Sequence, residues 1–102
     1  MNKYTGLSDF EINKKVAERL FLKFSDCSSV VLFEGESFNP CNNPADAMPI
    51  IIENGISMVR VNNTWSAHQF NNHCIEINGD SYYRIAMEVY LLMKDEENSN
   101  GN

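Results

Sequence analysis

The chain has 102 residues, the length of one domain, and 43% of its residues are hydrophobic and 11% aromatic. Such a chain buries roughly 60–70% of its unfolded surface, and this composition excludes a disordered protein. The formal net charge of −6 argues against general nucleic-acid binding, which depends on clustered Lys and Arg. An acidic surface instead favours solubility or a basic partner.

The cysteines and the apolar runs indicate the cell compartment. Cys27, Cys41 and Cys74 form an odd set without short repeated spacing. Residues 1–8 are polar and lack the apolar centre of a signal peptide. No apolar run approaches the ~20 residues that cross a bilayer. We therefore expect a cytoplasmic protein with reduced, buried thiols and no membrane contact.

The first predicted element is a helix from Asp9 to about Leu22. Ser8 and Glu11 form a capping box, in which the Ser8 hydroxyl accepts from a first-turn amide and Glu11 reaches back. At 100° per residue, the apolar side chains fall within one half-turn and predict the buried face. These are Phe10, Ile12, Val16, Ala17, Leu20, Phe21 and Phe24.

Two polar features of this helix are candidate sites. Asn13 lies within the apolar half-turn, and a buried amide needs partners, so we expect it to bond the backbone of a neighbouring loop. A ligand contact is the alternative. Lys15, Arg19 and Lys23 line one edge at i, i+4 and i+8. We expect a solvated face there, and the alternative is a contact with nucleic acid or an acidic partner.

The middle of the chain predicts a polar turn over 25–29, a buried strand over Val30–Phe33 and a second turn over 34–37. A helix start follows, with Asn43 as the N-cap and Pro44 at the first helical position.

Pro49 conflicts with a continuous helix here, because it lacks an N–H and clashes with the preceding turn. We therefore expect two short helical pieces, 44–47 and 49–55, the second ended by Gly55 in the left-handed conformation. A strand over Ile50–Ile52 is the alternative.

A β-meander should follow. Ile56–Val61 and Thr64–Phe70 are predicted to form a hairpin around Asn62-Asn63, because Asn tolerates left-handed angles. A turn at Asn71-Asn72 and a short strand over His73–Ile77 complete the prediction.

The last predicted element is a helix from about Ser81 to Lys94, capped by Asp80 or Ser81. It is apolar apart from a narrow strip that carries Arg84 and Glu88 as an i, i+4 pair. A helix this apolar is either central to the fold or part of a homo-oligomer interface.

Together these elements predict an α+β fold. We expect a single domain over residues 1–95, with a small antiparallel sheet of three or four strands and the two main helices packed on one face. The polar residues 96–102 should form a disordered C-terminal tail.

Three stretches carry a resemblance to a known family: Leu7-Ser-Asp-Phe-Glu-Ile-Asn-Lys-Lys-Val-Ala-Glu18, Cys41-Asn-Asn-Pro-Ala-Asp-Ala-Met-Pro-Ile-Ile-Ile-Glu-Asn-Gly-Ile-Ser57 and Arg84-Ile-Ala-Met-Glu-Val-Tyr-Leu-Leu-Met93. On these the chain resembles the NinX-like family of small proteins from lambdoid phages and prophages. The resemblance implies a phage or prophage accessory protein, in the cytoplasm of an infected or lysogenic bacterium. It supplies no catalytic residue.

The reactive side chains match no standard site. His68, His73, Cys41 and Cys74 lack the tight ligand pairs of structural zinc sites. A Cys–His nucleophile also needs an orienting group and an anion hole, which nothing local supplies. We therefore expect no metal, no cofactor and no catalytic residue.

The best candidates for a ligand or partner contact lie in the loop and helix after Cys41. They are Asn42, Asn43, Asp46 and Glu53. Asn43 and Asp46 have a structural explanation as a cap and a first-turn acid, and Asn42 and Glu53 have none. The leading hypothesis is a non-enzymatic module that binds a host or phage protein, and the alternative is a small ligand-binding domain or enzyme that uses this loop.

Overall fold

The computed structural model describes residues 2–70 and 74–100, which form three helices and two antiparallel sheets of three strands each. The elements in chain order are α1 (Asp9–Arg19), β1 (Phe24–Cys27), β2 (Val30–Phe33), β3 (Glu36–Ser37), α2 (Pro44–Glu53), β4 (Ser57–Val61), β5 (Thr64–Phe70), β6 (Cys74–Gly79) and α3 (Tyr82–Asn100).

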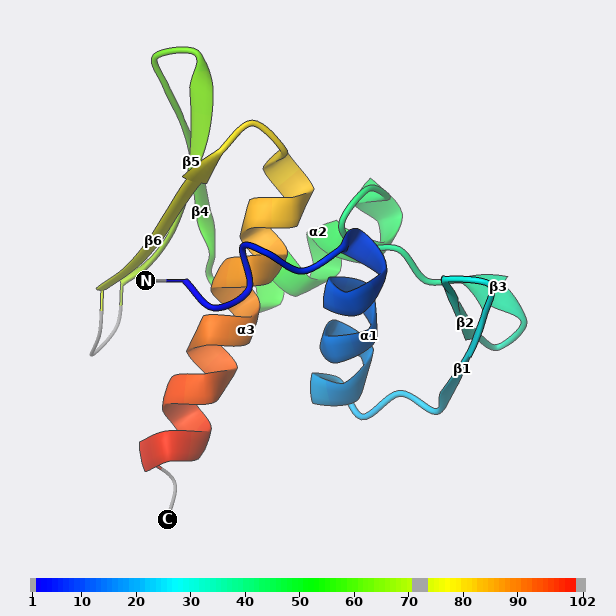
Figure 1. Cartoon of the computed structure of the whole chain (residues 1–102). Helices are drawn as coiled ribbons and strands as arrows, with labels where there is room; N and C mark the ends of the chain where they lie inside the picture. The colour runs from blue at the N-terminus through cyan, green and yellow to red at the C-terminus, as the bar shows by residue number, and fades with distance from the viewer. Residues whose placement is uncertain (1, 71–73, 101–102) are drawn as a thin grey trace.

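The two sheets lie at opposite ends of the molecule, with the helices between them (Figure 1). One sheet has the order β1-β2-β3, and the other has the order β4-β5-β6. Helix α3 contacts β5 and β6 and also packs against α1 and α2, whereas α1 contacts β2. The predicted α+β class is confirmed. The prediction of one sheet with both helices on one face is corrected to two sheets with the helices between them.

Helix α1 begins as predicted, and the capping box of Ser8 and Glu11 is confirmed. The helix ends at Arg19 rather than near Leu22. Phe21 adopts the left-handed conformation, with φ 60°. Its N–H donates to the Glu18 carbonyl at 3.1 Å, and the Leu22 N–H donates to the Ala17 carbonyl at 3.1 Å. These two bonds form a Schellman motif, so the local backbone stops the helix.

The predicted polar turn over residues 25–29 is wrong in part. Phe24–Cys27 is a strand that pairs antiparallel with Val30–Phe33, and only Ser28 and Ser29 form the turn. Both serines have positive φ, 52° and 66°, as a tight two-residue hairpin turn requires. Serine rarely adopts this conformation, so Ser28 and Ser29 are a weak hairpin signal. The strand Val30–Phe33 is confirmed, but only Val31 of it is buried. The predicted turn over 34–37 is wrong in part, because Glu36–Ser37 pairs with this strand.

Helix α2 is one continuous helix through Pro49, so the predicted break into two pieces and the alternative strand are both wrong. Proline removes one hydrogen bond of the helix, but Ala47, Ile50 and Ile51 are buried in the core on both sides of it. This packing holds the helix across the missing bond. The Asn43 cap and the terminator Gly55, with φ 64°, are confirmed.

The predicted hairpin is confirmed, since Val61 pairs with Thr64 and Asn62 has φ 57°. Strand β6 pairs antiparallel with β5, which confirms the meander. The predicted turn at Asn71-Asn72 and the start of the last strand at His73 lie outside the described residues.

Helix α3 is central to the fold, because all residues from Ile85 to Leu91 are buried within the chain itself. They pack with Ile12, Val16 and Ala17 of α1 and with the buried side of α2. The helix continues to Asn100, through part of the segment predicted as a disordered tail. Across the described ranges, no helix has the length and apolar content needed to cross a membrane.

Candidate binding site at the ends of the helices

A buried arginine joins the N-terminal segment to α1 and α3. Arg84 donates to Asp9 Oδ1 at 2.7 Å, to Glu88 Oε2 at 2.6 Å, and to the carbonyl oxygens of Tyr4 and Leu7 at 2.9 and 2.8 Å. Its side chain is 13% exposed, and that of Glu88 is 7% exposed. The predicted Arg84–Glu88 pair is confirmed, and the narrow strip that carries it lies inside the protein. We call these five residues the Arg84 network.

Hydrogen bonds within the Arg84 network keep Asp9 and Arg84 charged despite their burial. Burial alone would raise the pKa of Asp9, but the bonds from Arg84 and Asn42 outweigh it and hold that pKa below its ordinary value. Burial alone would lower the pKa of Arg84, but the bonds to Asp9 and Glu88 raise it. Burial also raises the pKa of the neighbouring Cys41 thiol to about 12, with a further contribution from Asp9. That thiol is therefore a poor nucleophile.

The buried Asn13 bonds the loop before α2, as predicted. Its Oδ1 accepts from the Cys41 N–H at 3.0 Å, and its Nδ2 donates to Asn39 Oδ1 at 2.8 Å. Asn42 donates from Nδ2 to Asp9 Oδ2 and to Asn39 Oδ1, both at 3.1 Å. Asn13 and Asn42 therefore lie in one chain of internal hydrogen bonds.

The other loop candidates divide between two places. Asp46 Oδ2 accepts from the Asn39 N–H at 2.9 Å and from Asn43 Nδ2 at 3.3 Å, while Asn43 Oδ1 caps α2. These side chains hold the loop together. Glu53 is exposed at the opposite end of α2 and lines a different cavity from Asp46.

A polar cluster on the second sheet was not foreseen from the sequence. Ser66 Oγ lies 2.9 Å from His68 Nε2 and donates to Glu76 Oε2 at 3.0 Å, and His68 Nδ1 lies 3.9 Å from Glu76 Oε1. The residue types match a nucleophile relay, but Ser66 is 0% exposed and its hydroxyl cannot meet a substrate in this structure. The signal was the i, i+2 spacing of Ser66 and His68 on one strand, with Glu76 opposite on the next.

Among the described residues, no group of three or more His, Cys, Asp or Glu is arranged to hold a metal ion. His73, one of the residues weighed as a ligand, lies outside the described residues.

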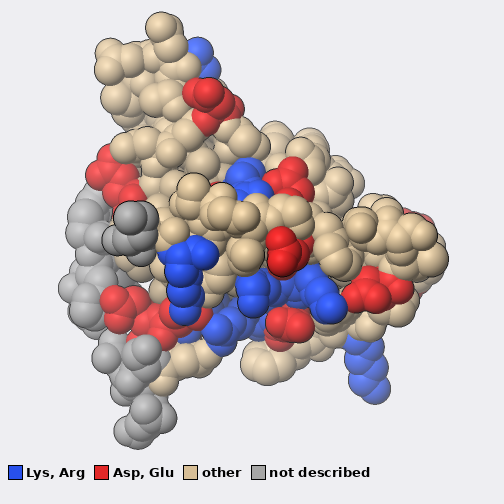
Figure 2. Space-filling view, in the orientation of Figure 1, with Lys and Arg blue, Asp and Glu red and all other residues tan. Residues whose placement is uncertain are grey.

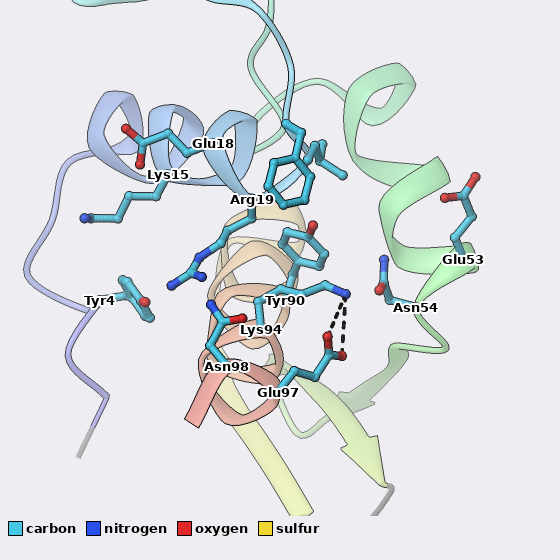
Figure 3. Close-up of a pocket in the computed structure, with 12 residues that line it drawn as sticks. Tyr4, Lys15, Glu18, Arg19, Glu53, Asn54, Tyr90, Lys94, Glu97 and Asn98 are labelled. Atoms are coloured by element: carbon cyan, nitrogen blue, oxygen red, sulfur yellow. Dashed lines mark hydrogen bonds and ion pairs between the residues drawn. The ribbon is translucent and has the colours of Figure 1, made fainter. Parts of the chain in front are cut away.

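A hollow lies where α1 and α2 end against the C-terminal half of α3 (Figure 3). This helix-end cavity has a volume of about 850 Å³. Its lining residues are Tyr4, Lys15, Glu18, Arg19, Leu20, Phe21, Glu53, Asn54, Tyr90, Lys94, Glu97 and Asn98. In Figure 3, Arg19 points toward Tyr4 on one side of Tyr90, and Lys94 points toward Asn54 on the other.

The wall near Arg19 is closed by its own ion pairs. Asp95 accepts from Arg19 at 2.6 Å and from the Tyr4 hydroxyl, and Lys3 lies 3.1 Å from it. Burial and the bond to Asp95 raise the pKa of Tyr4 to about 12. The wall near Lys94 is more open, because the partner of Lys94 at 3.2 Å is the exposed Glu97.

The predicted basic edge does not extend along one helix. Lys15 and Arg19 line the helix-end cavity, but Lys23 lies beyond the end of α1, so the i, i+8 relation fails. Figure 2 shows Lys and Arg gathered on this face with Asp and Glu between them. The described part of this face is therefore of mixed charge, unlike the continuous basic strip that follows a phosphate backbone.

Two aromatic residues of the cavity are unusual. Phe21 is 89% exposed, although its left-handed backbone is a conformation in which glycine is favoured. Tyr90 is 1% exposed and lines the cavity, and its hydroxyl makes no hydrogen bond to any residue that the structure describes. Burial also raises the pKa of Tyr90, so the phenol remains protonated. Neither feature could be predicted from the sequence, which placed both residues on buried helix faces.

Comparison with known proteins identifies the family of the chain. Searches of the curated proteins and of the solved structures returned no match. The family described as "Bacteriophage P22, NinX" matches residues 3–94, which span α1, both sheets and most of α3. This match covers nearly the whole chain, including all three stretches that carried the resemblance. The chain therefore belongs to the NinX family of bacteriophage P22.

Proposed function

We propose that this chain is a phage accessory protein that binds a host or phage protein in the bacterial cytoplasm, without catalysing a reaction, and that the partner docks on the helix-end cavity. The single observation that carries this proposal is the placement of Phe21. It combines an exposed fraction of 89% with a backbone φ of 60°, at the rim of a cavity of about 850 Å³.

The left-handed backbone at Phe21 lowers the stability of the isolated protein. A residue with a Cβ in the left-handed conformation costs about 1–2 kcal/mol relative to the right-handed one, and glycine avoids most of this cost. Helix α2 ends in the same motif with Gly55 at the equivalent position. An exposed phenylalanine at the rim regains that free energy only if a partner covers it, and aromatic anchors beside a cavity dominate protein interfaces.

The test is affinity capture with the full chain from phage-infected bacteria. Phe21→Gly should lose the captured partner while its free energy of unfolding stays equal or rises by up to about 1 kcal/mol. Val59→Thr is the matched control, because Val59 is 45% exposed on the distant β4 and threonine keeps the branched shape. The proposal fails if Phe21→Gly captures the same partner as the unmodified chain, or if neither captures a specific partner.

A further inference from the structure

Helix α2 presents an apolar stripe to solvent in addition to the apolar face that packs in the core. Ala45, Met48, Pro49 and Ile52 recur at i, i+3, i+4 and i+7, so they lie along one side of the helix. Ala45 and Pro49 are exposed, Met48 is partly buried, and Ile52 is 70% exposed. We call these four residues the α2 stripe.

The α2 stripe is unusual for a helix at the surface of a monomer. A surface helix normally turns charged and polar side chains to water, and a helix that is apolar on all sides is normally buried on all sides. The charged residues of α2 are Asp46 and Glu53, and neither belongs to the stripe. A contiguous exposed apolar surface marks an interaction site more often than a single exposed residue does. The stripe therefore indicates a surface that another protein covers.

The charge of Glu53 indicates which protein this is. Glu53 is the last residue of α2, at the negative end of the helix macrodipole, where a carboxylate is unfavourable. It is exposed, and it makes no hydrogen bond or ion pair with any residue that the structure describes. The N-terminus of a second helix would stabilise this carboxylate, because that end is positive. The exposed first turn of α2, at Pro44 and Ala45, is such an N-terminus.

We infer that the protein forms a homodimer in which the α2 stripes of two copies pack antiparallel across a two-fold axis. Met48 and Pro49 meet at the centre of this contact, and the large Ile52 side chain of each copy packs on the small Ala45 of the other. Glu53 of each copy then lies at the positive end of the second α2. Parallel packing would instead bring the two Glu53 carboxylates together at two negative helix ends, so charge selects the antiparallel arrangement.

The test is sedimentation equilibrium of the full chain at concentrations up to about 1 mM, because a contact between two short helices has a small area and gives a weak dimer. The unmodified chain should reach twice the mass of one chain. Ile52→Lys should stay monomeric, because each dimer loses two isoleucine contacts and gains two lysines at positive helix ends. Val59→Lys is the matched control, because it also replaces an exposed apolar residue but lies on β4, and it should dimerise like the unmodified chain.

Glu53→Gln tests how the two helices are arranged. It keeps the shape of the side chain but removes its charge, so it should weaken the dimer about threefold or more at low ionic strength. Parallel packing predicts a tighter dimer instead, because the repulsion between the two carboxylates is gone.

The inference is overturned by a chain that is monomeric at every concentration, or by an Ile52→Lys variant that dimerises like the unmodified chain. Equal dissociation of Ile52→Lys and Val59→Lys would also overturn it, since the effect would then not depend on the α2 stripe. An unchanged or tighter dimer in Glu53→Gln would exclude the antiparallel contact. Thermal unfolding of dilute Ile52→Lys should match that of the unmodified chain, because residue 52 faces solvent in the monomer.

Discussion

Removal of the Arg84 guanidinium should strongly destabilise this protein. In Arg84→Met the apolar stem remains, but Glu88 loses its 2.6 Å partner while its side chain is only 7% exposed. Glu88 then keeps only its hydrogen bond from Asn2, and a buried charge that has lost its ion-pair partner costs about 3–5 kcal/mol. A domain of this size has a total stability of about 5–15 kcal/mol, so the loss is a large fraction of the whole.

The measurement is urea or thermal unfolding followed by circular dichroism. For a domain of this length, 1 kcal/mol corresponds to about 4–8 °C in Tm, so Arg84→Met should unfold at least about 12 °C lower. The double variant Arg84→Met/Glu88→Leu removes both charges and should recover at least half of the lost stability, because the orphaned carboxylate is gone. Asp9 is 45% exposed at its side chain and can turn to solvent.

The same pair of variants decides whether the reasoning holds. A loss below about 1 kcal/mol in Arg84→Met would show that solvent reaches Glu88, contrary to its burial. A double variant as unstable as the single variant would show that the cost comes from the carbonyls of the N-terminal segment, and not from the orphaned charge.

Three further predictions concern neighbouring residues. Asn13→Ala should lower the free energy of unfolding by about 1–3 kcal/mol, because the buried Cys41 N–H loses its acceptor, and an unchanged melting curve would refute this. The folded-state pKa of Asp9 lies below its unfolded value of about 3.9, so its contribution to stability is present above about pH 4 and is lost as the pH falls through the lowered folded pKa. In Asp9→Asn, the free energy of unfolding should therefore depend less on pH in the acid range than in the unmodified protein. Parallel curves for the two proteins would contradict this assignment. Iodoacetamide at pH 8 should label the exposed Cys27 in the folded protein and leave Cys41 unmodified, because burial raises the Cys41 pKa to about 12; equal labelling in a peptide map would show that the loop opens readily.

The sequence predicted what local rules determine. The capping box at Ser8, the cap at Asn43 and the stop at Gly55 each depend on a few adjacent residues, and all three are confirmed. The hairpin around Asn62 is confirmed for the same reason. The bond from Asn13 to the loop was also predictable, because a polar residue on an apolar helix face must find a partner nearby.

The remaining features depend on contacts distant in sequence or on residues in uncommon conformations. Phe21 ends α1 where no glycine signals an end, so the predicted helix is too long. Pro49 lies within α2 because tertiary packing outweighs one missing hydrogen bond. The partners of Arg84 near the N-terminus are 75 or more residues away, so periodicity alone could not show that this strip is buried. The cavity follows from where three helices end, which no pattern within one helix specifies.

The bonds between the first residues and α3 affect when the protein can fold. Asn2 donates to Glu88, and the Tyr4 hydroxyl donates to Asp95, across separations of 86 and 91 residues. During synthesis, α1 leaves the ribosome long before these partners exist, and its contacts with α3 cannot yet form. Folding must therefore wait for nearly the whole chain, as long-range contacts generally slow it. An interrupted product that lacks α3 should remain unfolded and open to proteases, so only complete chains accumulate.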